Sequence, residues 1–171
     1  MKYLMMALLF ISNIGFTTAQ SKTGPELLEK SIAYHDPKGL WGKQVLLLEL
    51  EERRPDGSAR QTSLTFDPMQ DRFELSQQRG TDQLWRKIQG DSCQHQLNKR
   101  ATISKDDQRK HRLNCDHTAI MRGYYTYLWG LPMKLKDEGT ILAESTEMVD
   151  FQGEQLLALK VTYKETVGKD I

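Results

Sequence analysis

The spacing of apolar residues changes from helical to alternating early in the chain. Between Gly24 and Tyr34 the apolar residues follow a helical spacing, and Pro37 and Gly39 punctuate the chain just after it. From Gln44 the period becomes two, which is typical of strands. Further alternating segments follow at 58–66, 72–78, 83–89 and 93–97, with turn residues between them. Because no helix lies between these segments, the pattern predicts an antiparallel meander.

The first strand of the meander, 44–52, is apolar on both sides. Val45 and Leu47 point one way, while Leu46, Leu48 and Leu50 point the other way. We therefore expect both faces of this strand to be covered.

Two helices and two more strands complete the pattern. Ser104-Lys105-Asp106-Asp107 resembles a capping box and predicts a short polar helix to about Leu113, and a second helix is expected from Asp116 to Leu128. Strands are expected again at 140–149 and 154–164. An apolar sheet face has to be buried, so we expect the helices near 25–34 and 104–129 to cover it. The predicted fold is α+β: a single curved antiparallel sheet with helices on one face.

The first 19 residues have the pattern of a secretory signal peptide. Lys2 is followed by an apolar run from Tyr3 to Phe16, and Thr17-Thr18-Ala19 supplies small residues for cleavage before Gln20. The apolar run is too short to span a bilayer, which takes roughly 20 residues. The sequence thus predicts an exported protein, periplasmic or extracellular, that does not span the membrane, with one domain over 20–171.

The charges of the chain are balanced. It has 171 residues, with 24 Lys and Arg against 23 Asp and Glu. Nucleic-acid-binding proteins usually carry a basic excess or stripe, so we expect no nucleic-acid partner.

Export also determines how the two cysteines are interpreted. Cys93 and Cys115 are an even pair in an oxidising compartment, which favours a disulfide. His95, His111, His117 and Asp116 lie close in the sequence, so a metal site at the cysteines stays open as an alternative.

Aromatic residues are concentrated in the second of the two helices expected in the 104–129 region. Tyr124, Tyr125, Tyr127 and Trp129 fall within six residues. On a helix, Tyr124, Tyr127 and Leu128 share one face, while Tyr125 and Trp129 lie on another. Not all of these rings can enter one core, so some must line a surface, a groove or a partner.

The second candidate for a functional site is the dipeptide His35-Asp36. A His beside an Asp can belong to an acid–base or metal site, but Asp36-Pro37 is also a common start of a turn. The chain has no nucleophile motif, phosphate-binding loop or His-x-x-x-His spacing. We therefore expect neither an enzyme nor a cofactor.

Several segments of the chain carry a family resemblance: Ala33-Tyr34-His35-Asp36-Pro37 with Trp41, Asn114-Cys115, Tyr124-Tyr125-Thr126-Tyr127-Leu128, the run from Gly130 to Thr140, and Lys160-Val161-Thr162-Tyr163 with Val167-Gly168 and Asp170. With these, the chain resembles an uncharacterised family of exported proteins from Bacteroidota. The resemblance covers nearly the whole mature chain. It implies a fold similar to the LolA lipoprotein carriers, a half-open antiparallel barrel covered by helices that shields acyl chains. Such relatives usually continue with aromatic-rich strands, so we also expect Ile171 to end a truncated version of a longer protein.

Three functions follow from these observations. The first is an envelope protein that binds a lipid or a lipoprotein acyl chain between sheet and helices. Tyr124, Tyr127, Trp129, Met133 and His35 would lie at that ligand site. The second is a structural or interaction domain without a ligand. The third is a secreted hydrolase or metal-dependent enzyme that uses His35 and Asp36 or the region from Cys93 to His117.

Overall fold

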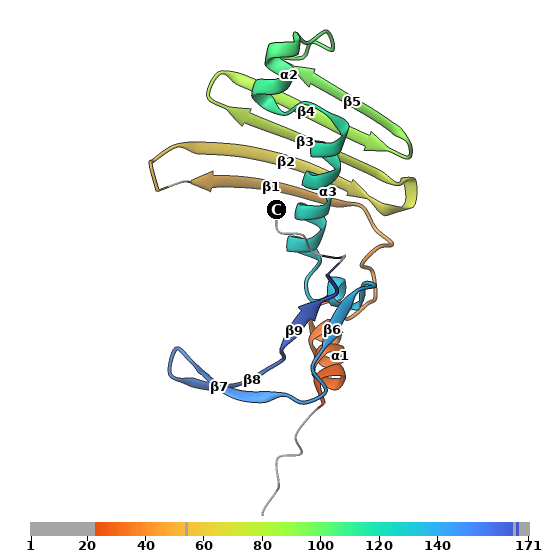
Figure 1. The fold of residues 1–171 in the computed structure, drawn as a ribbon, viewed down its shortest axis with the longest axis vertical. Helices are drawn as coiled ribbons and strands as arrows, with labels where there is room; N and C mark the ends of the chain where they lie inside the picture. The colour runs from red at the N-terminus through yellow and green to blue at the C-terminus, as the bar shows by residue number, and fades with distance from the viewer. Residues whose placement is uncertain (1–22, 54, 166, 168–171) are drawn as a thin grey trace, which may run out of the picture.

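The computed structural model describes residues 23–53, 55–165 and 167 (Figure 1). The predicted signal peptide lies outside the described residues. In chain order the elements are α1 (Gly24–His35), β1 (Leu46–Arg53), β2 (Ala59–Asp67), the 3-10 helix η1 (Pro68–Gln70), β3 (Arg72–Arg79), β4 (Asp82–Gln89), β5 (Ser92–Leu97), α2 (Lys105–His111), α3 (Cys115–Gly130), the 3-10 helix η2 (Met133–Lys136), β6 (Thr140–Leu142), β7 (Glu147–Phe151), β8 (Glu154–Ala158) and β9 (Val161–Tyr163).

The first five strands form the predicted antiparallel meander. Their order in the sheet is β1-β2-β3-β4-β5, and each strand pairs with the next along the chain. The sheet is open, because β1 and β5 are not paired with each other. The fold is therefore α+β, with a five-stranded antiparallel sheet at its centre.

One face of this sheet, which we call the inner face, carries the core. Leu64, Phe73 and Leu75 on β2 and β3 pack with Tyr125 of α3, and all four are buried. Leu48, Leu50 and Met121 pack around them and are partly buried. Figure 1 shows α3 running across the strands on this face. The middle of the space between α3 and the sheet is thus filled by side chains.

The predicted disulfide fixes the start of α3. Cys93 on β5 is bonded to Cys115, the first residue of the helix, and their Cα atoms are 5.8 Å apart. The short helix α2 is held beside β4, where the carbonyl of His111 accepts a hydrogen bond from Arg86 at 2.9 Å. Both helices expected in the 104–129 region are confirmed.

The expectation of one sheet that includes the C-terminal strands is wrong. The segment 140–149 divides into β6 and β7, and 154–164 divides into β8 and β9. β6 pairs with β9 and β7 pairs with β8, so they form two separate two-stranded sheets. The chain between β6 and β7 pairs with the start of α1, which separates the two strands. The backbone N–H of Gly24 donates to the carbonyl of Glu144 at 2.8 Å, and Thr23 forms an isolated β-bridge with Ser145.

The position of α1 also differs from the expectation that it covers the central sheet. A Cβ at Gly24 would lie 1.9 Å from the carbonyl oxygen of Ala143, so the helix start fits closely against the chain between β6 and β7. Figure 1 shows α1 beside β6 and β9, away from the five-stranded sheet. Thr23 and Glu26 form a capping box that starts the helix here.

The outer face of β1 is not covered as predicted. Leu47 is 63% exposed and Val45 is 55% exposed, whereas Leu46, Leu48 and Leu50 are partly buried on the inner face. The predicted alternation is confirmed, but α3 packs on the inner face of the strand and leaves Leu47 on the outer face exposed.

Candidate functional site

The helix α3 places most of the aromatic residues singled out in the sequence. It begins where the side chain of Asn114 accepts a hydrogen bond from the backbone of His117 at 2.8 Å. It ends at Gly130, where a Cβ would lie 2.4 Å from the ring of Trp41. Glycine at this position therefore allows the indole to lie against the end of the helix.

α3 has two apolar faces. Tyr125 on the first face is buried against the sheet. The second face exposes four large apolar side chains at the helical spacing i, i+4, i+7 and i+8, each between 38% and 47% exposed. We call this set the α3 stripe: Ile120, Tyr124, Tyr127 and Leu128.

Two predicted site residues, Tyr124 and Tyr127, lie in the α3 stripe. The ring of Tyr124 contacts the edge of the buried Tyr125, with ring centroids 5.2 Å apart. The hydroxyl of Tyr127 is hydrogen-bonded to the hydroxyl of Tyr163 on β9. Burial, and then this hydrogen bond, raises the pKa of Tyr163 to about 12. The α3 stripe therefore connects the central sheet to the C-terminal strands.

The other three predicted site residues are not in the α3 stripe. Trp129 is one turn beyond Tyr125 on the same side of the helix and is half exposed. Met133 begins η2 and is partly buried, while His35 is exposed at the end of α1. The sequence thus grouped residues that the structure places on separate surfaces.

His35 and Asp36 have the contacts of a helix end and a turn. The Nδ1 atom of His35 lies 2.9 Å from the carbonyl of Ser31. The two carboxylate oxygens of Asp36 accept hydrogen bonds from the backbone of Leu40 at 2.8 Å and Trp41 at 2.9 Å. These hydrogen bonds hold the pKa of Asp36 below its ordinary value. Both oxygens of Asp36 are thus occupied in shaping the turn.

The sulfur atoms of Cys93 and Cys115 lie close to the ring of His95, and the three ligand atoms are within 4.8 Å of one another. In the disulfide the sulfurs do not act as thiolate ligands. His95 Nε2 is also 2.9 Å from the hydroxyl of Thr118 on α3. This group of residues therefore joins β5 to α3.

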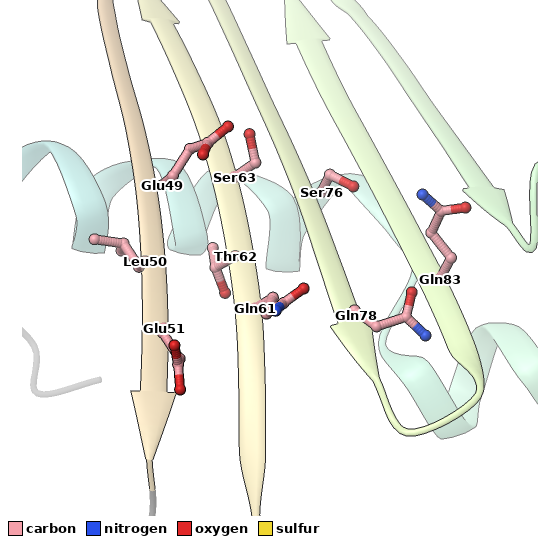
Figure 2. A pocket seen from close by; sticks show the side chains of 9 residues that line it. All are labelled: Glu49, Leu50, Glu51, Gln61, Thr62, Ser63, Ser76, Gln78 and Gln83. Carbon is pink, nitrogen blue, oxygen red and sulfur yellow. The ribbon is translucent and has the colours of Figure 1, made fainter.

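A polar hollow of about 470 Å³ lies on the opposite, outer face of the sheet (Figure 2). Its lining is dominated by carboxylates, amides and hydroxyls from four strands, namely Glu49, Glu51, Gln61, Ser63, Ser76, Gln78 and Gln83. Figure 2 shows α3 behind the strands, on the other side of the sheet. The lining suits water or a polar ligand and does not suit an acyl chain.

A second hollow, of about 420 Å³, adjoins α3 on the side away from the α3 stripe. Its walls include Trp41, Phe66 and Arg122, and the guanidinium of Arg122 lies 5.8 Å from the centre of the Phe66 ring. Arg122 is also paired with Asp71. The hollow is thus part aromatic and part charged.

The inner face carries charged residues that the sequence analysis did not single out as a site. Glu52 on β1 binds Arg60 on β2 through both carboxylate oxygens, and it accepts a hydrogen bond from the hydroxyl of Thr62 at 2.8 Å. Arg86 on β4 is buried on the same face. The sequence does contain a signal for Arg86. Leu84, Arg86 and Ile88 are two positions apart along the strand, so their side chains point to the same face.

Among the residues that the structure describes, none of the helices has both the length and the hydropathy to cross a bilayer.

No curated protein and no solved structure matches the chain. A family model described as "Family of unknown function (DUF6503)" matches residues 3–171. Because that match covers almost the whole sequence, the chain belongs to this family of unknown function.

Proposed function

We propose that the chain is an exported, non-catalytic protein of the cell envelope that binds an acyl chain of a lipid or a lipoprotein along α3. The observation that carries the proposal is the α3 stripe. A surface helix normally has one apolar face, which it packs on the protein, and a polar face toward water. α3 packs one apolar face on the sheet and leaves a second one exposed.

Exposed apolar side chains occur along α3 and, separately, on the hairpin of β7 and β8. Contiguous exposed apolar groups mark binding sites, whereas single exposed residues need no explanation. Tyr124 and Tyr127 bring hydroxyl groups that suit a partly wet surface. The hairpin of β7 and β8 also has large apolar side chains in the open, namely Met148, Val149, Phe151, Leu156 and Leu157.

A LolA-like half-barrel and export to the periplasm or beyond complete the proposal. The open antiparallel sheet with α3 across its inner face supports the first. The signal-peptide pattern supports the second. The polar outer hollow favours the side of α3, and not the outer face, as the place for an acyl chain.

The proposal is tested by calorimetric titration of the protein with monooleoylglycerol, a neutral molecule with one acyl chain. We expect binding by the wild type and a loss of about tenfold in affinity for the double variant Ile120→Gln/Leu128→Gln, because two half-exposed aliphatic side chains no longer contribute apolar contact. Both residues are exposed, so the variant should keep its fold, which circular dichroism checks.

The control is Leu47→Gln, which removes an exposed leucine, 63% accessible, from the outer face of β1. It should bind monooleoylglycerol like the wild type. Absence of binding by the wild type, or equal losses in the stripe variant and the control, would show that the α3 stripe is not an acyl-chain site.

A second candidate function is an interaction domain without a small ligand. The direct packing of Tyr125 and Met121 onto Leu64 and Leu75 favours it, because these side chains fill the centre of the space between helix and sheet. This candidate predicts no binding of monooleoylglycerol, so the same titration distinguishes the two.

A further inference from the structure

The polar hollow of about 470 Å³ on the outer face, which we call the outer hollow, is built from two rows of side chains (Figure 2). The rows follow the pairing of β1, β2, β3 and β4, because residues that are paired across strands point to the same face. The first row is Glu49, Ser63 and Ser76, and the second is Glu51, Gln61, Gln78 and Gln83. At the usual strand spacing the four strands span about 14 Å, so the site is an extended one.

Most polar groups of the outer hollow are available to a ligand. Gln78 donates to the carbonyl of Gly80 at 2.7 Å, and Glu51 is paired with Arg53 at 2.7 Å. In the described part of the chain, no hydrogen bond to another residue is made by the side chains of Gln61, Ser63, Ser76 and Gln83. The backbone groups of β2 and β3 are used in the sheet on both sides, so a ligand here meets side chains.

An aromatic ring borders the outer hollow at the end of the first row. Trp85 on β4 is paired with Ser76 and lies two residues from Gln83, on the same face of the strand. Its neighbours Leu84 and Arg86 are buried on the inner face, so the indole is on the outer face. Paired residues in an antiparallel sheet have Cβ atoms about 4.5–5.5 Å apart, which places Trp85 beside the lining. The indole adds a flat apolar surface to a polar site.

The charges of the lining argue against an anion and give little attraction for a free cation. Glu49 and Glu51 carry negative charge, and none of the described residues that line the outer hollow is Lys or Arg. An anion would therefore meet two carboxylates without a compensating cation. Glu51 is 54% exposed and already has a partner, so its charge is screened and attracts a cation only weakly. Amides and hydroxyls, which both donate and accept hydrogen bonds, make up most of the remaining polar lining.

We propose that the outer hollow binds a neutral oligosaccharide. A sugar ring has an apolar face, which suits Trp85, and a rim of hydroxyl groups that donate and accept like the amides and hydroxyls of the two rows. Carboxylates accept hydrogen bonds from the same hydroxyls. A peptide would instead extend the sheet at the free edge of β1 or β5, where backbone groups are open. The outer hollow lies across the sheet from α3, so the inference goes beyond acyl-chain binding and does not rest on it.

The test is calorimetric titration with three neutral oligosaccharides that differ in linkage and ring substituents, namely maltohexaose, cellohexaose and hexa-N-acetylchitohexaose. We expect at least one of them to bind in the millimolar range or more tightly. The double variant Gln61→Ala/Gln83→Ala should weaken that binding by about tenfold, because two hydrogen bonds to the ligand are lost.

The indole gives a second readout that a structural role alone would not produce. The chain has three tryptophans; Trp129 is on α3 and Trp41 lies against the end of that helix. Saturation with the bound oligosaccharide should change the tryptophan fluorescence of the wild type. Trp85→Phe keeps an aromatic ring, and in this variant the fluorescence change should disappear while the affinity falls by about 2- to 5-fold.

The matched control is Gln70→Ala/Gln155→Ala, which removes two exposed glutamines from η1 and β8, outside the outer hollow. Its affinity for the oligosaccharide should stay within about twofold of the wild type, as expected for surface substitutions away from the site. Circular dichroism checks that all variants keep the fold.

Three results would overturn the inference. The first is that none of the three oligosaccharides binds. The second is that one binds, but Gln61→Ala/Gln83→Ala and the control lose the same affinity. The third is that spermidine binds and the oligosaccharides do not, which would make the outer hollow a cation site. Ile120→Gln/Leu128→Gln should bind the oligosaccharide like the wild type, and Gln61→Ala/Gln83→Ala should bind monooleoylglycerol like the wild type, so each proposal can fail without the other.

Discussion

Removal of the disulfide between Cys93 and Cys115 tests how the central sheet holds α3. The two residues are 22 positions apart in the sequence. In the chain-entropy model, a cross-link that closes a loop of this length lowers the entropy of the unfolded chain by an amount worth about 3 kcal/mol at 25 °C. That is a large part of the stability of an ordinary domain, which is about 5–15 kcal/mol. The free energy of unfolding of Cys93→Ser/Cys115→Ser should therefore fall by about 3 kcal/mol.

Urea unfolding followed by circular dichroism measures this loss. The dependence of the free energy on urea should also become steeper, because the unfolded chain without the cross-link is more expanded. Wild-type protein in a reducing agent should show the same loss, and the double variant should not respond to the reducing agent. A loss under about 1 kcal/mol in both cases would refute the assignment of this stabilisation to the cross-link.

Two further predictions follow from the packing of α3 and from its surroundings. Gly130→Ala should lower the free energy of unfolding by about 1–3 kcal/mol, because the new methyl group meets the ring of Trp41, whereas Gly123→Ala in the same helix has open space and should raise it by about 0.5–1 kcal/mol. Chemical denaturation of the two variants checks both signs, and equal effects would contradict the close contact. Burial, and then nearby positive charge, holds the pKa of His95 and His117 below 6.5, so the unfolded chain takes up protons at a higher pH than the folded chain. Stability should therefore fall as the pH drops from 7.5 to 5.5, and His95→Gln/His117→Gln should reduce that fall; an unchanged fall in the double variant would assign it to other groups.

The central sheet could be predicted because its strands follow local rules. The alternation of Arg60, Leu64 and Phe66 places them on one face, and β2 has that arrangement. Turn residues separate each pair of strands, and a meander needs no other information. The spacing on α3 likewise separated Tyr125, which is buried, from Tyr124, which is exposed.

The C-terminal strands and the charged part of the inner face depend on contacts between distant segments. The break between β6 and β7 arises where Gly24 bonds to Glu144, and the sequence does not indicate that contact. The partners of Arg86 come from β3 and from the end of α2, so its burial follows from the way these elements meet. The predicted ligand residues Trp129, Met133 and His35 were grouped by composition and by resemblance, which do not determine their positions.

The claim that α3 binds an acyl chain is tested most directly by native mass spectrometry of the protein purified from its own cells without detergent. We predict a second species, heavier than the bare chain by the mass of a lipid, that is lost in Ile120→Gln/Leu128→Gln and kept in Leu47→Gln. Solvent extraction of the same sample should release that lipid. A single species at the mass of the bare chain, with no lipid in the extract, would contradict the proposal.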